Sequence, residues 1–328
     1  MEKQVKLFLE LIEPAKSIVL TTHVNPDGDG LGCEIAMAEF LASRGKQVGI
    51  INHSSTPYYY QFLDQERKIQ QFNPTQHGHI LHTADIIIVL DTNNPDRLAS
   101  MKNVVLNSPA KKICIDHHLD KADFANLYIL DEPSAATGEI LYRMLIEMNG
   151  DKFSKNTATA LYTAIMTDTG SFRFPKTDPE IHRQAAHLIE CGADPVVIYQ
   201  QVYEQGGAGR IHLLGKALST LNIIHDGKVA TLYITKKMFD ETNTSGVDAD
   251  NIVNYTLSIN GVQIGVMLSE MESSIKINFR SKGEIWINKL AKEFGGNGHK
   301  NAAGARIQDG KLQTLLEQVT ERTKKYTN

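Results

Sequence analysis

A short segment near the N-terminus combines one histidine and two aspartates at a spacing that could bind metal ions. His23, Asp27 and Asp29 lie within seven positions, directly after the β-branched apolar run at residues 18–22. The run suits a short buried strand, a proline and a glycine favour a turn after it, and residues 33–43 carry the apolar spacing of a helix. Ligands of open α/β sheets gather at the carboxyl ends of strands, so the segment predicts a metal-binding strand end. The alternative is a solvated acidic turn in which Asp29 caps the following helix.

The same residue types follow two later predicted strands. Residues 84–90 include a continuous β-branched run of the kind that parallel sheets bury between helices, and Asp91 comes directly after it. Residues 111–115 contain another short apolar run, at 113–115, and the sequence Asp-His-His follows at residues 116–118. Three predicted strands therefore end in residues that can ligate a metal.

A further carboxylate, Asp168, is expected where a helix that begins near Ser154 or Asn156 ends. A carboxylate at the C-terminal end of a helix faces the unfavourable end of the helix dipole and needs a compensating partner. A metal ion would supply this partner, whereas exposure to water is the alternative.

Six side chains at these strand and helix ends offer mostly oxygen ligands with a minority of imidazoles. This set suits Mn²⁺ or Mg²⁺ better than Zn²⁺. So many carboxylates cannot remain ionised together without cations, which predicts a two-metal site with one bridging aspartate. In such sites the ions lie roughly 3.5 to 4 Å apart, activate a water and clamp a phosphoryl group for in-line displacement. The predicted reaction is phosphoester hydrolysis. The six residues are His23, Asp27, Asp29, Asp91, His117 and Asp168.

A glycine-rich segment at residues 295–304 is a second candidate site. Gly296 and Gly298 let the backbone approach a ligand closely and could leave amides free to bind an anion. His299 and Lys300 lie in the same segment and favour a phosphate ligand. The alternative is a glycine-rich helix end followed by a turn.

Two other clusters have weaker functional interpretations. The three tyrosines at residues 58–60 could stack on nucleobases, although consecutive side chains point in different directions and most of them are expected in the core. His77, His79 and His82 lack an acidic neighbour before Asp85, so we predict a solvated loop for them and no metal site.

The elements that must position these residues predict a two-domain α/β protein. The chain has 328 residues, of which 41% are hydrophobic, and so can bury two cores. We expect a parallel-sheet α/β domain over residues 1–195, a linker helix region over 196–215, and a smaller α+β domain over 216–328, with a cleft between the domains. Expected helices include one capped by Ser134 and one over residues 249–259.

Composition narrows the class of protein. The net charge of -4 gives no overall positive field that would attract long nucleic acid. Three widely spaced cysteines without a C-x-x-C pair argue against a disulfide framework or a thiolate zinc site. Residues 1–14 have the pattern of a docking helix without a signal-peptide core, and the longest apolar run, residues 86–90, is too short to cross a bilayer. We therefore expect a soluble, cytoplasmic protein.

These motifs resemble those of a known family. Residues 23–29, the strand that ends in Asp91, the Asp-His-His at 116–118 and Asp168 are similar, in this order, to the four motifs of the DHH phosphoesterase superfamily. Residues 295–304 resemble the GGGH motif of the DHH-associated domain found in one branch. Within that branch, the length of the chain and its two-domain organisation are similar to those of the bacterial nanoRNase and 3′-phosphoadenosine 5′-phosphate phosphatase (NrnA-type) proteins. The resemblance covers nearly the whole chain.

The resemblance implies roles for individual residues. His118 would contact the scissile phosphate, and Asp116 would orient the histidines. Arg280 and His299 would grip the substrate's phosphate or terminal nucleotide, although Arg280 could instead be an exposed charge at a strand end. The implied metal ligands form two sets that share Asp91 as a catalytic bridge: His23, Asp27 and Asp91 for one ion, and Asp29, Asp91, His117 and Asp168 for the other.

The implied activity is a Mn²⁺-dependent phosphohydrolase with two divalent cations, Mg²⁺ being the other candidate metal. Its substrates would be short RNA oligonucleotides and the nucleotide bisphosphate 3′-phosphoadenosine 5′-phosphate. Neither long nucleic-acid duplexes nor membranes are expected as partners. A homodimer is left open. The enzymatic alternative is a phosphodiesterase of cyclic di-AMP or its linear product, and the non-enzymatic one is an inactive nucleotide-binding regulator. The presence of every predicted ligand disfavours the regulator. Inorganic pyrophosphatase is disfavoured because that branch carries a different second domain.

Overall fold

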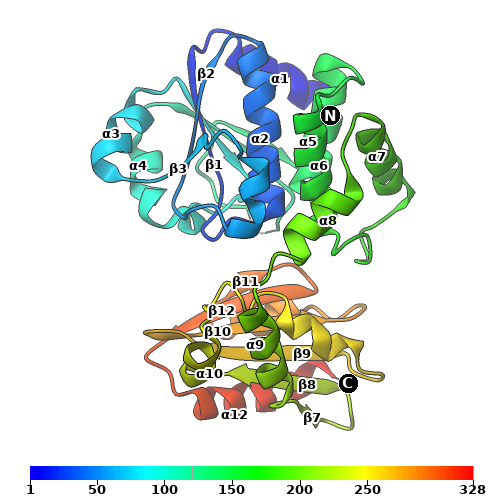
Figure 1. The fold of residues 1–328 in the computed structure, drawn as a ribbon. Coiled ribbons are helices and arrows are strands. Elements are labelled where there is room, and N and C mark those ends of the chain that lie inside the picture. The colour runs from blue at the N-terminus through cyan, green and yellow to red at the C-terminus, as the bar shows by residue number, and fades with distance from the viewer. Residues whose placement is uncertain (120, 328) are drawn as a thin grey trace. The chain divides into compact units, whose positions relative to one another are not determined.

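The computed structural model describes residues 1–119 and 121–327. The chain divides into two compact units, Met1–Gln205 and Gly206–Asn328 (Figure 1). The expected linker region over residues 196–215 contributes helix α8 to the first unit and helix α9 to the second. None of the helices in the described part of the chain has the length and apolar character needed to cross a membrane.

The first unit alternates strands and helices. Its elements, with 3₁₀-helices written η, are α1 (Glu2–Ile12), β1 (Ser17–Thr21), α2 (Gly28–Ser43), β2 (Gln47–Asn52), η1 (Tyr58–Leu63), β3 (Ile69–Gln71), α3 (Pro74–Thr83), β4 (Ile86–Leu90), η2 (Pro95–Met101), α4 (Lys102–Asn107), β5 (Lys111–Asp116), β6 (Leu127–Leu130), α5 (Thr137–Asn149), α6 (Lys155–Asp168), α7 (Pro179–Glu190) and α8 (Pro195–Tyr203).

The six strands of this unit form one parallel sheet in the order β3-β2-β1-β4-β5-β6. The predicted parallel-sheet α/β architecture is therefore confirmed. The chain adds strands on one side of β1 and then, from β4, on the other side. Parallel α/β sheets bind ligands where the strand order reverses in this way, at the carboxyl ends of the strands. His23 follows β1 and Asp91 follows β4, so both lie at this point.

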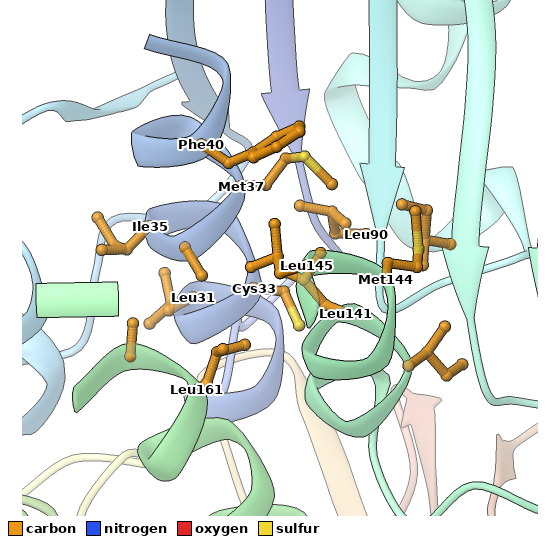
Figure 2. Packing of buried hydrophobic residues seen from close by; sticks show 14 of the residues in the cluster. Leu31, Cys33, Ile35, Met37, Phe40, Leu90, Leu141, Met144, Leu145 and Leu161 are labelled. Atoms are coloured by element: carbon orange, nitrogen blue, oxygen red, sulfur yellow. The ribbon is translucent and has the colours of Figure 1, made fainter. Parts of the chain in front are cut away.

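Alternate residues of the central strands pack against helices on opposite faces of the sheet. Ile88 and Leu90 of β4 belong to the apolar cluster that includes α2, α5 and α6, which Figure 2 shows from close by. Ile87 and Val89 belong to the cluster on the other face, with α3 and α4. Every residue of β4 is buried, as the β-branched run predicts.

Small residues allow α2 and α6 to pack closely. A Cβ atom placed on Gly32 of α2 would lie 2.3 Å from the carbonyl oxygen of Ala160 and 3.1 Å from the Cβ of Ala164, both on α6. This close approach brings the first turn of α2, which carries Asp29, alongside the last turn of α6, which carries Asp168. Helix packing therefore helps to assemble the site.

The second unit is built on a mixed sheet in the order β11-β12-β10-β9-β8-β7, in which only β8 and β9 pair in parallel. This agrees with the predicted smaller α+β fold. Its elements are α9 (Ala208–Leu218), β7 (Asn222–Ile224), β8 (Val229–Ile234), α10 (Lys236–Thr242), η3 (Ile252–Ser258), β9 (Ile264–Glu270), β10 (Ser274–Ser281), α11 (Ile287–Lys292), β11 (Asn297–Gly298), β12 (Ala302–Gln308), α12 (Leu312–Thr323) and η4 (Lys324–Tyr326).

The loop predicted for the histidines at residues 77–82 is wrong, because helix α3 covers this segment. The Asn73 side chain caps the helix by accepting hydrogen bonds from the amides of Thr75 and Gln76, and Pro74 occupies the first turn. His77 is buried and hydrogen-bonds Gln70. The capping hydrogen bonds and the proline in the first turn stabilise a helix that the intrinsic propensities of the segment alone would not favour.

Two predicted helix starts are also wrong. Ser134 does not cap α5, which begins at Thr137, because its hydroxyl hydrogen-bonds the Asp131 carboxylate instead. The helix predicted over residues 249–259 is a 3₁₀-helix that begins later, since Asn251 adopts a left-handed conformation with φ of 69° and interrupts the turn.

The α2–α6 contact predicts opposite effects for two glycine-to-alanine substitutions. Gly32→Ala should lower the free energy of unfolding by about 1–3 kcal/mol, because the added methyl group overpacks against a backbone carbonyl. Gly215→Ala in α9 is the matched control: open space surrounds this position, so the better helix propensity of alanine should stabilise the chain by about 0.5–1 kcal/mol. Urea denaturation followed by circular dichroism measures both, and an unchanged or higher stability for Gly32→Ala would contradict the packing argument.

Candidate metal centre

The loop between β1 and α2 places His23 against two carboxylates. The His23 Nδ1 donates to the carbonyl oxygen of Val24 at 2.9 Å. This hydrogen bond orients the ring so that Nε2 faces the two carboxylates. That Nε2 lies 3.2 Å from Asp91 Oδ2 and 3.6 Å from Asp27 Oδ2. His23 and Asp91 are both buried, so the neighbouring β1 and β4 strand ends hold one compact group of possible ligands.

Asp27 caps α2, contrary to the alternative in which Asp29 has this role. The Asp27 Oδ1 accepts hydrogen bonds from the amides of Asp29 and Gly30 at 3.0 and 3.2 Å, leaving Oδ2 directed at His23. Pro26 and Gly28 were expected to form the turn before this helix, but Gly28 is already the first residue of the helix. The cap orients one carboxylate oxygen for other partners.

Asp29 is held by the N-terminus of another helix. Its two carboxylate oxygens accept the amides of Thr137 and Gly138, at 2.7 and 2.8 Å, in the first turn of α5. Free amides and the helix dipole stabilise a negative charge at this position. Asp29 Oδ2 also lies 3.8 Å from His117 Nε2.

The carboxylate of Asp91 lies between two groups of side chains. One oxygen, Oδ2, faces His23, whereas Oδ1 lies 3.7 Å from His117 Nε2 and accepts a hydrogen bond from the Thr137 hydroxyl at 2.9 Å. Asp91 has a φ of 59°, a left-handed conformation that aspartate tolerates better than most residues. The backbone conformation thus helps to direct its two oxygens at different neighbours.

His117 and Asp168 complete the second group. His117 Nδ1 donates to the carbonyl oxygen of Ser134 at 3.2 Å, and its Nε2 lies 3.1 Å from Asp168 Oδ2 at the end of α6. The structure therefore brings all six predicted ligands together. They form two groups, in each of which the ligand atoms lie within 4.8 Å of one another: His23, Asp27 and Asp91, and Asp29, His117 and Asp168.

Asp116 orients the two histidines that follow it. Its Oδ1 accepts the backbone amide of His117 at 2.8 Å and the Nδ1 hydrogen of His118 at 2.6 Å. Asp116 is fully buried, so this contact fixes the His118 ring with Nδ1 protonated. With the hydrogen on Nδ1, the Nε2 of His118 acts as a hydrogen-bond acceptor.

Two residues that the sequence analysis missed contact His118 from the segment after β4. Arg97 Nη1 lies 3.3 Å from His118 Nε2, and Asn93 Nδ2 donates to the His118 carbonyl oxygen at 2.8 Å. The carbonyl oxygen of Arg97 also accepts the amide of Val24, next to His23, at 2.7 Å. The one feature of the sequence that could have pointed to Asn93 and Arg97 is that they follow Asp91 closely, at the edge of the sheet where the ligands were expected.

Arg97 is a cation that lies beside His118 and acts electrostatically on His23. Among residues 1–119 and 121–327 it forms no ion pair with a carboxylate, and it is half-buried. Its guanidinium group presents several N–H donors in a planar fork, a geometry that suits phosphate oxygens. The site therefore combines a cluster of carboxylates with a neighbouring arginine.

The carboxylates of the candidate site need positive charge nearby, from protons or from metal ions. Burial and Arg97 would lower the pKa of His23, but the Asp27 and Asp91 carboxylates raise it to about 9. Burial opposes protonation of His117 too, yet Asp168 and the other carboxylates raise its pKa to about 10. Burial and the neighbouring carboxylates hold the pKa of Asp29 well above its usual range. Protons can neutralise this cluster, and divalent cations can replace them, so the donor set fits a metal.

The glycine-rich segment of the second unit differs from the expected anion-binding loop. The amides of Gly296 and His299 donate to the carbonyl oxygens of Ala291 and Ala302, both at 2.8 Å. The amide of Gly298 donates to the side chain of Asn297 at 2.8 Å. The expectation that these amides are free is therefore wrong. The glycines instead let β11 pair with β12, and a Cβ atom on Gly298 would lie only 2.4 Å from the Cα of Ala303.

The predicted substrate-binding side chains of this unit lie near the ends of β10 and β12. Arg280 is half-buried near the end of β10, and its Nε donates to Asn254 Oδ1 at 3.0 Å. Lys300 forms an ion pair of 2.7 Å with Glu284. His299 immediately precedes Lys300 and lies three residues before Ala302, where β12 begins. The structure places the three near one end of the sheet, while their role in substrate binding stays a prediction.

Comparison with known families agrees with this architecture. The DHH family N-terminal domain matches residues 17–165, and the DHHA1 domain matches residues 226–325. A solved structure of an exopolyphosphatase-related protein from Bacteroides fragilis superposes with a TM-score of 0.92 at 32% identity, covering 99% of this chain and 97% of that one. The chain belongs to the DHH family of phosphoesterases. The predicted family and the predicted enzyme class are confirmed.

Two curated relatives have names that describe their activities. The bifunctional oligoribonuclease and PAP phosphatase NrnA of Thermus thermophilus is 28% identical over 322 residues, which is 97% of this chain and 93% of that protein. The protein of the same name from Bacillus subtilis is 28% identical over 293 residues, covering 89% of each. Both similarities extend through the two units.

The raised histidine pKa values predict how the metal-free protein responds to pH. The folded-state pKa values of about 9 and 10 for His23 and His117 exceed the unfolded value of about 6.5, so protonation stabilises the fold. This stabilisation is complete below pH 6.5 and is lost as the pH rises through 9 to 10. The Tm of EDTA-treated protein should fall over this window, whereas saturating Mn²⁺ should raise Tm and reduce the decline.

Differential scanning fluorimetry over a pH series provides the measurement. The His23→Gln variant lacks one of the two titrating groups, so its Tm should decline less steeply in EDTA. A Tm of the EDTA-treated wild-type protein that stays constant or rises between pH 7 and pH 10 would contradict the assigned electrostatics.

Proposed function

We propose that this chain is a Mn²⁺-dependent hydrolase of short oligoribonucleotides and of the 3′-phosphate of 3′-phosphoadenosine 5′-phosphate. The observation that carries the proposal is the position of Asp91, whose two oxygens face the His23 group and the His117 group. This is the arrangement that a bridging ligand between two ions requires. The names of the NrnA relatives support the choice of substrates.

Two divalent cations fit the donor set, with His23, Asp27 and Asp91 holding one and Asp29, Asp91, His117 and Asp168 the other. When bound, they would neutralise the carboxylates and supply an activated water for phosphoester hydrolysis. Mn²⁺ accepts both carboxylate and imidazole ligands, which favours it over Mg²⁺ here. Fold and ligand chemistry support this assignment, and the metal's identity is part of the proposal.

The protein's own groups bind and orient the scissile phosphate. Arg97 donates to its non-bridging oxygens and stabilises the charge that develops on them. His118 Nε2 reaches the same phosphate, and Asp116 keeps the opposite nitrogen protonated so that the ring stays in place. Asn93 fixes the backbone of His118 from the same segment that carries Arg97.

The second unit would bind the rest of the nucleotide. In this proposal residues 216–328 contribute the side chains of Arg280, His299 and Lys300 to contacts with the substrate. A local set of cations explains how a chain with net charge -4 binds short nucleic acid without a basic surface.

Removing the bridge should abolish hydrolysis without unfolding the chain. Asp91→Asn keeps the side-chain shape and tolerates the left-handed backbone, but it removes the charge shared by the two groups. We expect kcat/KM to fall by roughly 10²- to 10⁴-fold, because metal ions supply several kcal/mol of transition-state stabilisation. Retained activity with bound Mn²⁺ would exclude the bridging role.

Arg97→Gln should lower kcat/KM by about 10- to 150-fold, the equivalent of one charge-assisted hydrogen bond to phosphate. Lys102→Gln is the matched control, since Lys102 follows the same segment but pairs with Asp96 at the surface. The control should keep wild-type activity. Equal losses in both variants would show that only the general positive charge matters.

A substrate panel tests the proposed function as a whole. Purified protein with Mn²⁺ should release phosphate from 3′-phosphoadenosine 5′-phosphate and degrade dinucleotides faster than a twenty-nucleotide RNA. Cyclic di-AMP as the preferred substrate would favour the phosphodiesterase alternative. Binding of nucleotides without turnover of any panel member would favour the regulator.

A further inference from the structure

The only tryptophan of the chain lies exposed beside the glycine-rich segment. Trp286 is the N-cap residue of α11, and 41% of its surface is accessible. Two ammonium groups lie next to its indole ring: Lys289 Nζ at 5.2 Å and Lys300 Nζ at 5.7 Å from the ring centroid. An exposed indole ring with two ammonium groups beside it offers a ligand both a π-face and positive charge.

The loop that carries Trp286 is fixed in place. The side-chain amide of Asn301 donates to Ser281 Oγ and the carbonyl oxygen of Gly283, both at 3.0 Å, and to the carbonyl oxygen of Ile285 at 3.3 Å. The amide of Ile287, directly after the tryptophan, donates to the carbonyl oxygen of Lys300 at 2.7 Å. Trp286 is thus attached to the segment that the proposed function assigns to substrate binding.

We infer that Trp286 is a stacking platform for a nucleobase of the substrate, with Lys289 and Lys300 binding an adjacent phosphate. The chemistry of the cluster specifies such a ligand, because a nucleotide combines a flat π-system with an anionic group. Base stacking on an aromatic side chain changes affinity by about 5- to 150-fold, and an exposed cation–π contact by about 2- to 5-fold. A base can therefore displace an exposed lysine from the ring.

The lysines are able to make this exchange. Lys289 is exposed, and the partner of Lys300, Glu284, is 93% exposed, so their present contacts are weak and screened by water. A lysine side chain that moves off the indole ring remains close enough to bind the phosphate of the stacked nucleotide. The pairing of ring and phosphate contacts favours a nucleotide over an uncharged aromatic ligand.

This inference rests on the proposed function, since it names the surface that holds the base of that same substrate. The single tryptophan makes a direct test available. The full-length protein in EDTA should show saturable quenching of its fluorescence on titration with the dinucleotide pApA, without hydrolysis of the ligand. Ribose 5-phosphate, which has no base, should cause no saturable quenching. An unchanged fluorescence with pApA up to millimolar concentration would overturn the inference.

Variants provide the second arm of the test. Trp286→Ala should raise KM for pApA by about 5- to 30-fold with little change in kcat, and Trp286→Phe should restore most of the affinity. Ile223→Ala is the control, because Ile223 is a similarly exposed apolar residue on β7, the opposite edge strand of the same sheet. An unchanged KM for Trp286→Ala would overturn the inference.

The two proposals fail in different ways. If wild-type protein hydrolyses no member of the substrate panel but pApA still quenches the tryptophan, the proposed function fails and the base-binding surface stands. If hydrolysis is normal and neither fluorescence nor KM responds, only the stacking inference fails. A loss of Tm in Trp286→Ala is resolved by the Trp286→Phe variant and by the wild-type titration.

Discussion

Repulsion between closely packed carboxylates is the interaction on which the rest of this structure depends. Asp29 and Asp91 are buried beside Asp27 and Asp168, and ionised carboxylates in so small a volume are unstable without positive charge. The fold supplies hydrogen-bond donors from the first turns of α2 and α5. These donors stabilise individual oxygens but do not change the net charge, so the cluster must bind either protons or metal ions.

The sheet topology determines which side chains share that volume. The strand order reverses between β1 and β4, so the loops that follow these two strands leave the sheet next to each other. His23 comes from one loop and Asp91 from the other. The segment after β5 supplies His117 from the next strand along, and the close packing of α2 on α6 adds Asp29 and Asp168. Four separate segments thus converge because the fold places their ends at one edge.

The sequence predicted the parts of this arrangement that local signals specify. A continuous β-branched run identified β4 and a short apolar run identified β5. The polar residues directly after them identified the ligands, because the carboxyl ends of parallel strands share an edge. Arg97 and Asn93 were missed since their roles arise from contacts with His118 that are distant in sequence. Such contacts have no periodic pattern that marks them.

Two of the errors, at Ser134 and in the glycine-rich segment, have a common physical origin. Ser134 was expected to cap a helix, but a tertiary contact with Asp131 engages its hydroxyl. The glycine-rich segment was expected to offer free amides, whereas pairing of β11 with β12 and the packing of α11 use them. In both cases the local sequence allowed more than one conformation or hydrogen-bond partner, and tertiary contacts determined which one formed.

The central claim is that Asp91 bridges two metal ions. Anomalous diffraction from crystals grown with Mn²⁺ tests it most directly. The account predicts two peaks roughly 3.5 to 4 Å apart, both in contact with Asp91, one beside His23 and Asp27 and the other beside Asp29, His117 and Asp168. A single peak, or two peaks of which only one contacts Asp91, would contradict it.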